Sequence, residues 1–532
     1  MGEEPKQPDS ADPAPSGTNR RTLLATGAAA LAGIGIGGGT AVLMRSTGGA
    51  PLLWSQPDRS GAPPVAGLHL QFGRNAATEV VVSWHTTDAV HNPHVMVGTP
   101  GSGFGRIVQA ETRTYRDAKS NTEVRVNHAV LDGLTPDTDY VYAAVHDGAT
   151  REFGTVRTAP SGRKRLCFTS FGDQATPTLG RLVGTTYVSD NLGSPAAGDT
   201  TAAIERIGPL FNLVNGDLCY ANLARDRIRS WSDWFDNNTR SARYRPWMPA
   251  AGNHENELGN GPVGYAAYQT YFALPDSGSD AQLRGLWYSF TAGSVRVISL
   301  NNDDVCFQDG GNFYVHGYSG GAQKRWLERE LADAQRDRAI DWIVICMHQT
   351  AISTTDRTNG ADLGIRQEWL PLFDRYQVDL VVCGHEHHYE RSHPVRGTLD
   401  TETRMPIPVD TRTDVIDTTR GTVHVVIGGG GTSAPSNALF FPEPRCRVLT
   451  GVGEFDPEIG RKTPIYVTED APWSAFRDRD NPYGFAAFEV DPGQPGGYTS
   501  IKATHYAVNG PFGAITAVDQ FTLAKPRAGS NP

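Results

Sequence analysis

The stretch Val378–Arg391 reads VDLVVCGHEHHYER, and the rest of the chain is organised around it. Val378 to Cys383 has the length and the β-branched composition of a buried strand in an α/β protein. Gly384 lets the backbone turn where the sheet ends. His385 and His387 therefore leave the carboxyl end of a strand, where open α/β sheets place their ligand sites. This arrangement favours metal ligation over the alternative of capped or core histidines.

The composition is that of a globular, mildly acidic protein. The chain has 532 residues, a formal net charge of −10, 39% hydrophobic residues and 20% charged residues. This length predicts more than one domain. The acidic balance argues against a protein that works by electrostatic binding to nucleic acid, so we expect no nucleic acid partner.

Residues 1–50 are predicted to be a Tat-type signal or anchor with a disordered N-terminus. Arg20-Arg21 precede a weakly apolar, Gly/Ala-rich run that ends near Met44, which is typical of bacterial twin-arginine export signals. The alternative is a transmembrane anchor, because the run is just long enough to span a bilayer. We expect an exported protein, secreted or at the cell surface, that contacts a membrane only through this segment if it is not cleaved.

Residues 63–160 are predicted to form an all-β sandwich. Short alternating strands such as Val80–Trp84 and Val124–Val130 dominate this region. The segment Leu131–Tyr140, LDGLTPDTDY, resembles the turn of fibronectin type III domains, whose tyrosine packs at a corner of the sandwich. Titratable residues do not cluster here, so we interpret this domain as a structural neighbour of the active site.

Residues 165–515 are predicted to be an α/β domain, followed by a C-terminal tail at 516–532. Candidate strands alternate with helical patterns such as Ala322–Ala334, and each strand runs into a polar cluster. In chain order the clusters are Gly172-Asp173, Asn215-Gly216-Asp217-Leu218-Cys219-Tyr220, Gly252-Asn253-His254-Glu255, Met347-His348 and Gly384-His385-Glu386-His387. Each cluster alone is equally typical of a turn or a helix cap. Their order is more informative.

This series resembles the motifs of calcineurin-like metallophosphoesterases, and the tyrosine three residues after the second aspartate is similar to that of purple acid phosphatases. The segments Gly384–Arg391 and Ser474–Arg477 also resemble that family, as does a sandwich ahead of the α/β domain. The resemblance extends from about residue 63 to about residue 510. It implies a fibronectin type III-like sandwich followed by a metallophosphoesterase domain with a two-sheet αββα core.

The resemblance also implies a dimetal centre and a division of its ligands. Asp217 would bridge the two metals, and it has the anionic side chain that a shared ligand needs. Asp173, Tyr220 and His387 would complete a hard site for Fe(III), and Asn253, His348 and His385 would complete a site for Zn(II), Mn(II) or Fe(II). Hydroxide bound at this centre would attack phosphorus. His254 would stabilise the transition state or protonate the leaving oxygen.

One departure from the family concerns substrate recognition. Many members carry paired histidines after the strand-end histidine, whereas here His348 is followed by QTAISTTDRTNG. Thr354, Thr355 and Arg357 are candidate substitutes, although they are equally typical of an ordinary polar loop. The loop 301–319, with Asp303, Asp304 and His316, is a further candidate for lining the cleft.

The six cysteines form no C-x-x-C pair, so the sequence supports neither a zinc cluster nor a thioredoxin-like motif. Cys167, Cys219, Cys346 and Cys383 lie in or beside predicted core strands and are interpreted as buried thiols. Cys306 and Cys446 are predicted to lie in loops, where they could pair after export.

The sequence thus predicts an exported acid phosphatase that hydrolyses phosphate monoesters. Two alternatives stay open: a phosphodiesterase with the same dimetal site, and a non-catalytic binding protein at the cell surface. The complete ligand set favours an enzyme. The physiological substrate, the second metal, cleavage of the signal and the oligomeric state do not follow from the sequence.

Overall fold

The computed structural model describes residues 61–527, except 178–180, 184, 189–191, 309–313, 459–460 and 511–513. All of these residues belong to one compact unit, Pro57–Pro532. The predicted signal or anchor at 1–50 lies outside the described residues. Within the described part of the chain, the helices are too short or too polar to cross a membrane.

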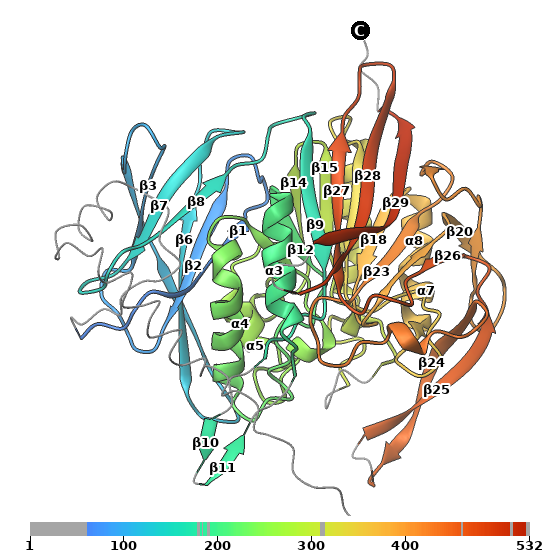
Figure 1. Cartoon of the computed structure of the whole chain (residues 1–532), viewed down its shortest axis with the longest axis horizontal. Helices are drawn as coiled ribbons and strands as arrows, with labels where there is room; N and C mark the ends of the chain where they lie inside the picture. Colours follow the sequence, from blue (N-terminus) through green and yellow to red (C-terminus); the bar gives the residue numbers. More distant parts are fainter. Residues whose placement is uncertain are drawn as a thin grey trace, which may run out of the picture. The chain divides into compact units, whose positions relative to one another are not determined.

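The first part of the chain forms a β-sandwich (Figure 1). One sheet has the strand order β1-β2-β6-β5 and the other the order β4-β3-β7-β8. The strands are β1 (Ala66–Phe72), β2 (Val80–Thr86), β3 (His94–Gly98), β4 (Arg106–Gln109), β5 (Glu111–Arg116), β6 (Glu123–Leu131), β7 (Asp139–Val145) and β8 (Glu152–Arg157). The Tyr140 hydroxyl accepts a hydrogen bond from the Thr135 backbone N–H at 2.8 Å, as in the corner turn that the sequence indicated.

The α/β domain contains two seven-stranded sheets. The first has the order β13-β12-β9-β27-β28-β29-β22 and the second the order β14-β15-β16-β18-β23-β19-β26. The first consists of β9 (Leu166–Phe171), β12 (Phe211–Val214), β13 (Trp247–Pro249), β22 (Val415–Asp417), β27 (Gly484–Asp491), β28 (Tyr498–Val508) and β29 (Ile515–Pro526). The second consists of β14 (Tyr288–Ala292), β15 (Val295–Ser299), β16 (Trp342–Cys346), β18 (Leu380–Cys383), β19 (Tyr389–Ser392), β23 (Val423–Ile427) and β26 (Ser474–Arg477).

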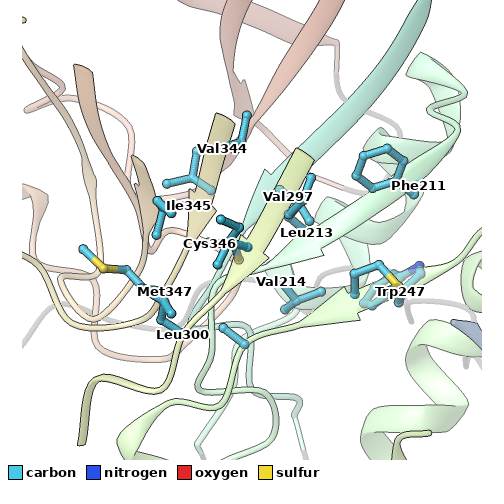
Figure 2. Close-up of a cluster of buried hydrophobic side chains, with 14 of the residues drawn as sticks. Phe211, Leu213, Val214, Trp247, Val297, Leu300, Val344, Ile345, Cys346 and Met347 are labelled. Atoms are coloured by element: carbon cyan, nitrogen blue, oxygen red, sulfur yellow. The ribbon is translucent and has the colours of Figure 1, made fainter. Parts of the chain in front are cut away.

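An apolar core lies between these two sheets. Figure 2 shows Phe211 and Leu213 of β12 in one cluster with Val297 of β15 and Val344 of β16. Each of these four residues is at most 1% exposed. Burial of this kind stabilises a fold by roughly 1.5–3 kcal/mol per large side chain. The facing sheets are therefore held together mainly by the hydrophobic effect.

Helices cover the outer faces of the two sheets. On one side lie α3 (Ala196–Ile207), which contacts β27 and β28, and α4 (Arg227–Ala242), which packs between α3 and β1 of the sandwich (Figure 1). On the other side, α6 (Ala322–Arg336) contacts β16, and α7 (Leu363–Glu368) is followed by α8 (Leu370–Arg375). The predicted fold class, a sandwich followed by a two-sheet αββα domain, is confirmed.

The remaining elements are short or peripheral. The helix α5 (Ala266–Tyr271) packs against β2, β5 and β6 of the sandwich. The strands β17 (Ala361–Asp362), β24 (Arg445–Asp456) and β25 (Arg461–Asp470) form a small sheet, β20 (Val395–Thr398) pairs with β21 (Pro406–Pro408), and β10 (Arg181–Val183) pairs with β11 (Thr186–Val188). Short 3-10 helices lie at Asn253–Glu255, Ala281–Leu283, Asn302–Asp304 and Asn437–Leu439.

Two expectations from the sequence are wrong. The predicted tail at 516–532 is for the most part the strand β29, which pairs with β28 and β22 and buries Phe521 and Leu523. Cys306 and Cys446 both carry free, buried thiols, so they do not pair. Cys446 lies in β24, and its sulfur accepts a hydrogen bond from the Arg366 guanidinium at 3.4 Å, so its side chain packs inward from a strand.

Candidate metal centre

The predicted ligands follow the carboxyl ends of five strands. In the first sheet, β9, β12 and β13 run parallel and lead to Asp173, Asp217 and Asn253. In the second sheet, β16 and β18 run parallel and lead to His348 and His385. Parallel strands present their carboxyl ends at the same edge of a sheet. Because the two sheets face each other, the strand-end loops of both meet at one place.

One group of ligands surrounds Asp217. The His348 Nε2 lies 3.1 Å from the Asp217 Oδ2 and 3.0 Å from the Asn253 Oδ1. The His385 Nδ1 lies 3.1 Å from the same His348 nitrogen. Ligand atoms of Asp217, His348 and His385 all fall within 4.8 Å of one another, and all three residues are buried. The structure therefore groups the side chains assigned to the divalent site and the proposed bridge.

The second group surrounds Asp173. The Tyr220 hydroxyl lies 3.3 Å from the Asp173 Oδ1 and 3.1 Å from the His387 Nε2. That histidine nitrogen is 3.4 Å from the Asp173 Oδ1. The two groups are joined through Asp173, whose Oδ2 accepts a hydrogen bond from the His385 backbone N–H at 2.8 Å. These are the residues assigned to the iron site.

The protonation of the histidines fits cation binding. The His348 Nδ1 lies 2.7 Å from the Asn215 carbonyl oxygen, and the His387 Nδ1 lies 2.6 Å from the Ala434 carbonyl oxygen. A carbonyl oxygen only accepts hydrogen bonds, so each Nδ1 carries a proton, and each Nε2 is the nitrogen that can bind a cation once it has lost its own proton. The Nε2 of His348 then faces oxygens of Asp217 and Asn253 that are themselves acceptors. A cation satisfies all of these donor atoms at once.

The electrostatics of the cluster supports the same conclusion. Burial alone would lower the pKa of His348, but the charges of Asp217 and Asp173 and its hydrogen bonds outweigh burial and raise this pKa to about 10. Burial and the neighbouring charge of His348 hold the pKa of His385 well below its usual range. Without a metal, a proton on His348 therefore compensates the carboxylates. Metal binding would displace that proton.

The backbone is strained at the ligands. Asp173, Asp217, Tyr220 and His385 have φ values of 55°, 52°, 56° and 71°. Residues other than glycine rarely adopt this left-handed region, and such strain concentrates at functional sites. Gly384 and Gly252 give the room that the carboxylates need: a Cβ on either would lie 2.3 Å from an oxygen of Asp173 or Asp217, respectively.

Two residues that were not predicted from the sequence, Glu255 and Asn222, hold the site in shape. The Glu255 carboxylate accepts hydrogen bonds from the backbone N–H groups of Asp217, Leu218 and Gly252, each at 2.8 Å, and joins two ligand-bearing loops. The Asn222 Oδ1 lies 2.9 Å from the His254 Nδ1. The position of Glu255 next to the Asn-His pair was a signal, whereas the pairing of Asn222 with His254 depends on contacts between loops.

The three residues that were candidates for contacting substrate differ in exposure. Thr354 and Thr355 are fully buried, and their hydroxyls donate to Glu390 and Glu386, so they support the loop and do not face substrate. Arg357 is exposed.

In the loop 301–319, Asp303 is buried and accepts hydrogen bonds from Tyr265 and Gln349. Asp304 is also buried and accepts from Ser319. The His316 Nδ1 lies 2.9 Å from the Cys306 carbonyl oxygen. The two aspartates are therefore committed to internal contacts, and the expectation that they line the cleft is wrong.

Comparisons with known proteins agree with this architecture. Residues 65–158 match the family described as the purple acid phosphatase N-terminal domain, and residues 187–389 match the calcineurin-like phosphoesterase family. An uncharacterized protein of Mycobacterium tuberculosis is 77% identical over 99% of this chain and 100% of its own length. A purple acid phosphatase of Glycine max is 27% identical over 69% of this chain and 72% of its own length.

The fold has a solved counterpart. A purple acid phosphatase from yellow lupin (Lupinus luteus) seeds superposes with a TM-score of 0.63 and 21% identity, covering 87% of this chain and 75% of the lupin chain. The sandwich, the two-sheet domain and the metal-ligand cluster thus occur together in one chain that both family models match. The chain belongs to the purple acid phosphatase family of calcineurin-like metallophosphoesterases, and it is a hydrolase of phosphate esters with a dimetal type of site.

Proposed function

We propose that this protein is an exported phosphatase that hydrolyses phosphate monoesters. The observation that carries the proposal is the placement of His254 beside the predicted ligands. Its backbone N–H donates to the Asp217 Oδ1 at 2.9 Å, and its Nε2 lies 3.8 Å from the Asp217 Oδ2. The imidazole is thus held next to the bridge while its Nε2 stays outside hydrogen-bond distance of the carboxylate.

His254 is suited to protonate a leaving group. The amide oxygen of Asn222 only accepts hydrogen bonds, so the Nδ1 of His254 carries a proton and its Nε2 is the nitrogen that can exchange one. A positioned acid assists most when the leaving oxygen is basic, as in alkyl phosphates. The side chain of His254 is 19% exposed, which gives a substrate access to it.

The donor atoms favour two different metals. An aspartate, a phenol and an imidazole around Asp173 make a hard site suited to Fe(III), while the two imidazoles and the amide around His348 suit Zn(II), Mn(II) or Fe(II). When bound, such metals supply Lewis acidity, which lowers the pKa of water and offsets negative charge near phosphorus. The buried carboxylates and imidazoles of this chain would hold the metals away from bulk water.

The function is tested with purified protein of known metal content on matched phosphate esters. We expect turnover of aryl and alkyl monoesters and little turnover of the corresponding diesters. Asp217→Asn is the matched inactive control, because it removes the bridging charge at nearly constant volume and should reduce kcat by several orders of magnitude. Preferential turnover of diesters would instead establish a phosphodiesterase.

Export rests on Arg20-Arg21 and the apolar run that follows them. Replacing both arginines by lysine keeps the charge but removes the pair that the twin-arginine route reads. We expect folded, active protein to accumulate in the cytoplasm of a bacterial host. Unchanged secretion of the double variant would mean that another route exports the protein.

A further inference from the structure

The turn between β5 and β6 of the sandwich reaches the loops that carry the active site. This turn comprises residues 117–122, with the sequence DAKSNT. The backbone N–H of Ala118 donates to the Asn260 Oδ1 at 2.8 Å, and the Lys119 ammonium donates to the Ala224 carbonyl oxygen. One short turn of the first domain thus contacts two separate loops of the second.

A buried ionic network reinforces these contacts. Asp117 is fully buried, and its Oδ1 lies 3.3 Å from the Arg227 Nη1 and 3.4 Å from the Asn260 Nδ2. The Arg227 guanidinium also lies 3.7 Å from a carboxylate oxygen of Glu257, which accepts hydrogen bonds from Trp231 and Asn260. Buried charges are costly unless they are paired, so removing one partner of this network should have a large effect.

The two contacted loops are those that position the proposed acid. Residues 220–226 carry Tyr220 and Asn222, and residues 253–260 carry Asn253 and His254. Each is a series of tight turns, with Leu223 N bonded to Tyr220 O, Ala224 N to Ala221 O, Asn256 N to Asn253 O and Asn260 N to Glu257 O. The contact between His254 and Asn222 crosses from one loop to the other. The sandwich turn holds both sides of that contact.

We infer that Asp117 and Lys119 of the sandwich are positioning residues for catalysis: they fix the spacing of the two loops and thereby the orientation of the His254 imidazole. This inference deepens the proposed function and rests on it. An acid must lie within hydrogen-bond reach of its substrate, and a displacement of about 1 Å can cost roughly a hundredfold in rate. The sandwich is then part of the catalytic apparatus as well as a structural neighbour.

The structure offers a matched control at the other end of the same helix. Arg227 is the first residue of α4, and Arg243 is the residue that caps its end. The Arg243 guanidinium lies 2.9 Å from a carboxylate oxygen of Glu152 in β8 of the sandwich. Glu152→Gln therefore breaks an ion pair between the same two domains, but at the end of α4 away from Arg227 and the contacted loops.

The test compares Asp117→Asn, Lys119→Met and Glu152→Gln in the metal-loaded protein. Metal content and thermal stability are measured for each, together with kcat and KM for an alkyl and an aryl phosphate. We expect Asp117→Asn and Lys119→Met to lower kcat for the alkyl ester by roughly tenfold or more, with a smaller loss for the aryl ester and full metal content. Glu152→Gln should lower stability without changing the ratio of the two rates.

A readout independent of turnover separates this inference from the proposed function. The ring nitrogens of histidine are labelled with ¹⁵N in zinc-substituted protein, and the His254 resonances are assigned by their loss in His254→Ala. We expect them to shift in Asp117→Asn and to stay unchanged in Glu152→Gln. If the wild type hydrolyses no phosphate ester, the proposed function fails while this shift still reports positioning. Unshifted resonances, or equal rate losses in Asp117→Asn and Glu152→Gln, would overturn the inference.

Discussion

The two ring nitrogens of His254 differ: Nδ1 lies 2.9 Å from the Asn222 Oδ1, whereas Nε2 lies 3.8 Å from the Asp217 Oδ2. This asymmetry makes a kinetic prediction. His254→Ala should retain both metals, because the ring is outside the ligand set. Turnover of alkyl phosphates should fall by about 10²- to 10⁴-fold, the usual contribution of a general acid. The loss should be smaller for aryl phosphates, whose leaving oxygens need no proton. Steady-state kinetics across a series of leaving groups measures this slope, and equal losses along the series would favour electrostatic stabilisation by His254.

Tyr220 makes a spectroscopic prediction. Burial, followed by the charges of Asp173 and Asp217, raises the pKa of this phenol well above its usual value, so it stays protonated unless a strong Lewis acid replaces its proton. With ferric iron bound, we expect a visible phenolate-to-iron charge-transfer band and a pink to purple protein. Tyr220→Phe should remove the band while keeping the ring beside His254, 4.4 Å away between centroids. A colourless protein with stoichiometric ferric iron would contradict this ligand assignment.

Individual ligands could be predicted from the sequence for a physical reason. Asp173, Asp217, His348 and His385 each follow a buried strand directly, so a local pattern points to a common edge. Asp117 and Arg227 carry no comparable signal, because their pairing joins two domains. Asn222 likewise acquires its role only from a loop distant in sequence. Residues whose roles depend on such long-range contacts could not be identified in advance.

At the scale of elements, two buried carboxylates hold the loop Ser353–Gly360. Glu386, between the ligands His385 and His387, accepts hydrogen bonds from the hydroxyls of Thr355 and Thr358 and from the Gly360 backbone N–H. Glu390 accepts hydrogen bonds from the backbone N–H and hydroxyl of Thr354. These hydrogen bonds therefore tie the loop Ser353–Gly360 to the segment that carries the ligands His385 and His387.

The hydrogen bonds to Glu386 should protect the loop Ser353–Gly360 from proteolysis. Glu386→Ala leaves three donors without an acceptor, so the loop should open more often. Trypsin should then cleave after Arg357, whose side chain is 78% exposed, several times faster than in the wild type. Glu386→Gln is the matched control, since it keeps one acceptor oxygen and should give an intermediate rate. Mass spectrometry of timed digests measures the cleavage, and equal rates in all three proteins would disprove the restraint.

Elements were predicted well where the pattern was local and poorly where pairing determined it. The strands β2 and β18 and the start of α6 lie where alternating residues, a β-branched run and helical periodicity placed them. β13 is only three residues long, and it is a strand because it pairs with β12. β29 alternates buried and exposed residues irregularly, with a register shift opposite β28, so its pattern resembled a polar tail.

At the scale of the whole molecule, two buried histidines, His69 and His128, and the partly buried His85 lie where the sandwich meets the second domain. The His69 Nε2 lies 2.9 Å from the Tyr271 carbonyl oxygen, and the His128 Nε2 lies 2.9 Å from the Thr270 carbonyl oxygen. The His85 ring packs against Phe235 and Tyr271. Burial lowers the pKa of His69 and of His85 to about 4, with the charge of His69 adding to the effect on His85, and burial holds that of His128 well below 6.5.

These histidines predict a loss of stability in acid. Each pKa is lower in the folded protein than in the unfolded chain, so the unfolded chain binds more protons between about pH 6.5 and pH 4. The free energy of unfolding should therefore fall as the pH drops through this window. His85→Phe should remove up to about 1.4 kcal/mol per pH unit from that slope. Urea unfolding from pH 7 to pH 4.5 measures it, with the exposed His91→Gln as control, and an unchanged slope in His85→Phe would contradict the prediction.

The left-handed backbone of Asp173, Asp217, Tyr220 and His385 has a consequence for how this chain evolves. Each such conformation costs of order 1–3 kcal/mol, and glycine would relieve it. Mutational drift in a lineage that no longer needed metal chemistry would therefore be drawn towards glycine at these four positions, because each replacement would stabilise the fold. All four still carry side chains with ligand atoms. The chain therefore keeps ligand-bearing side chains at four positions where glycine would be the more stable residue.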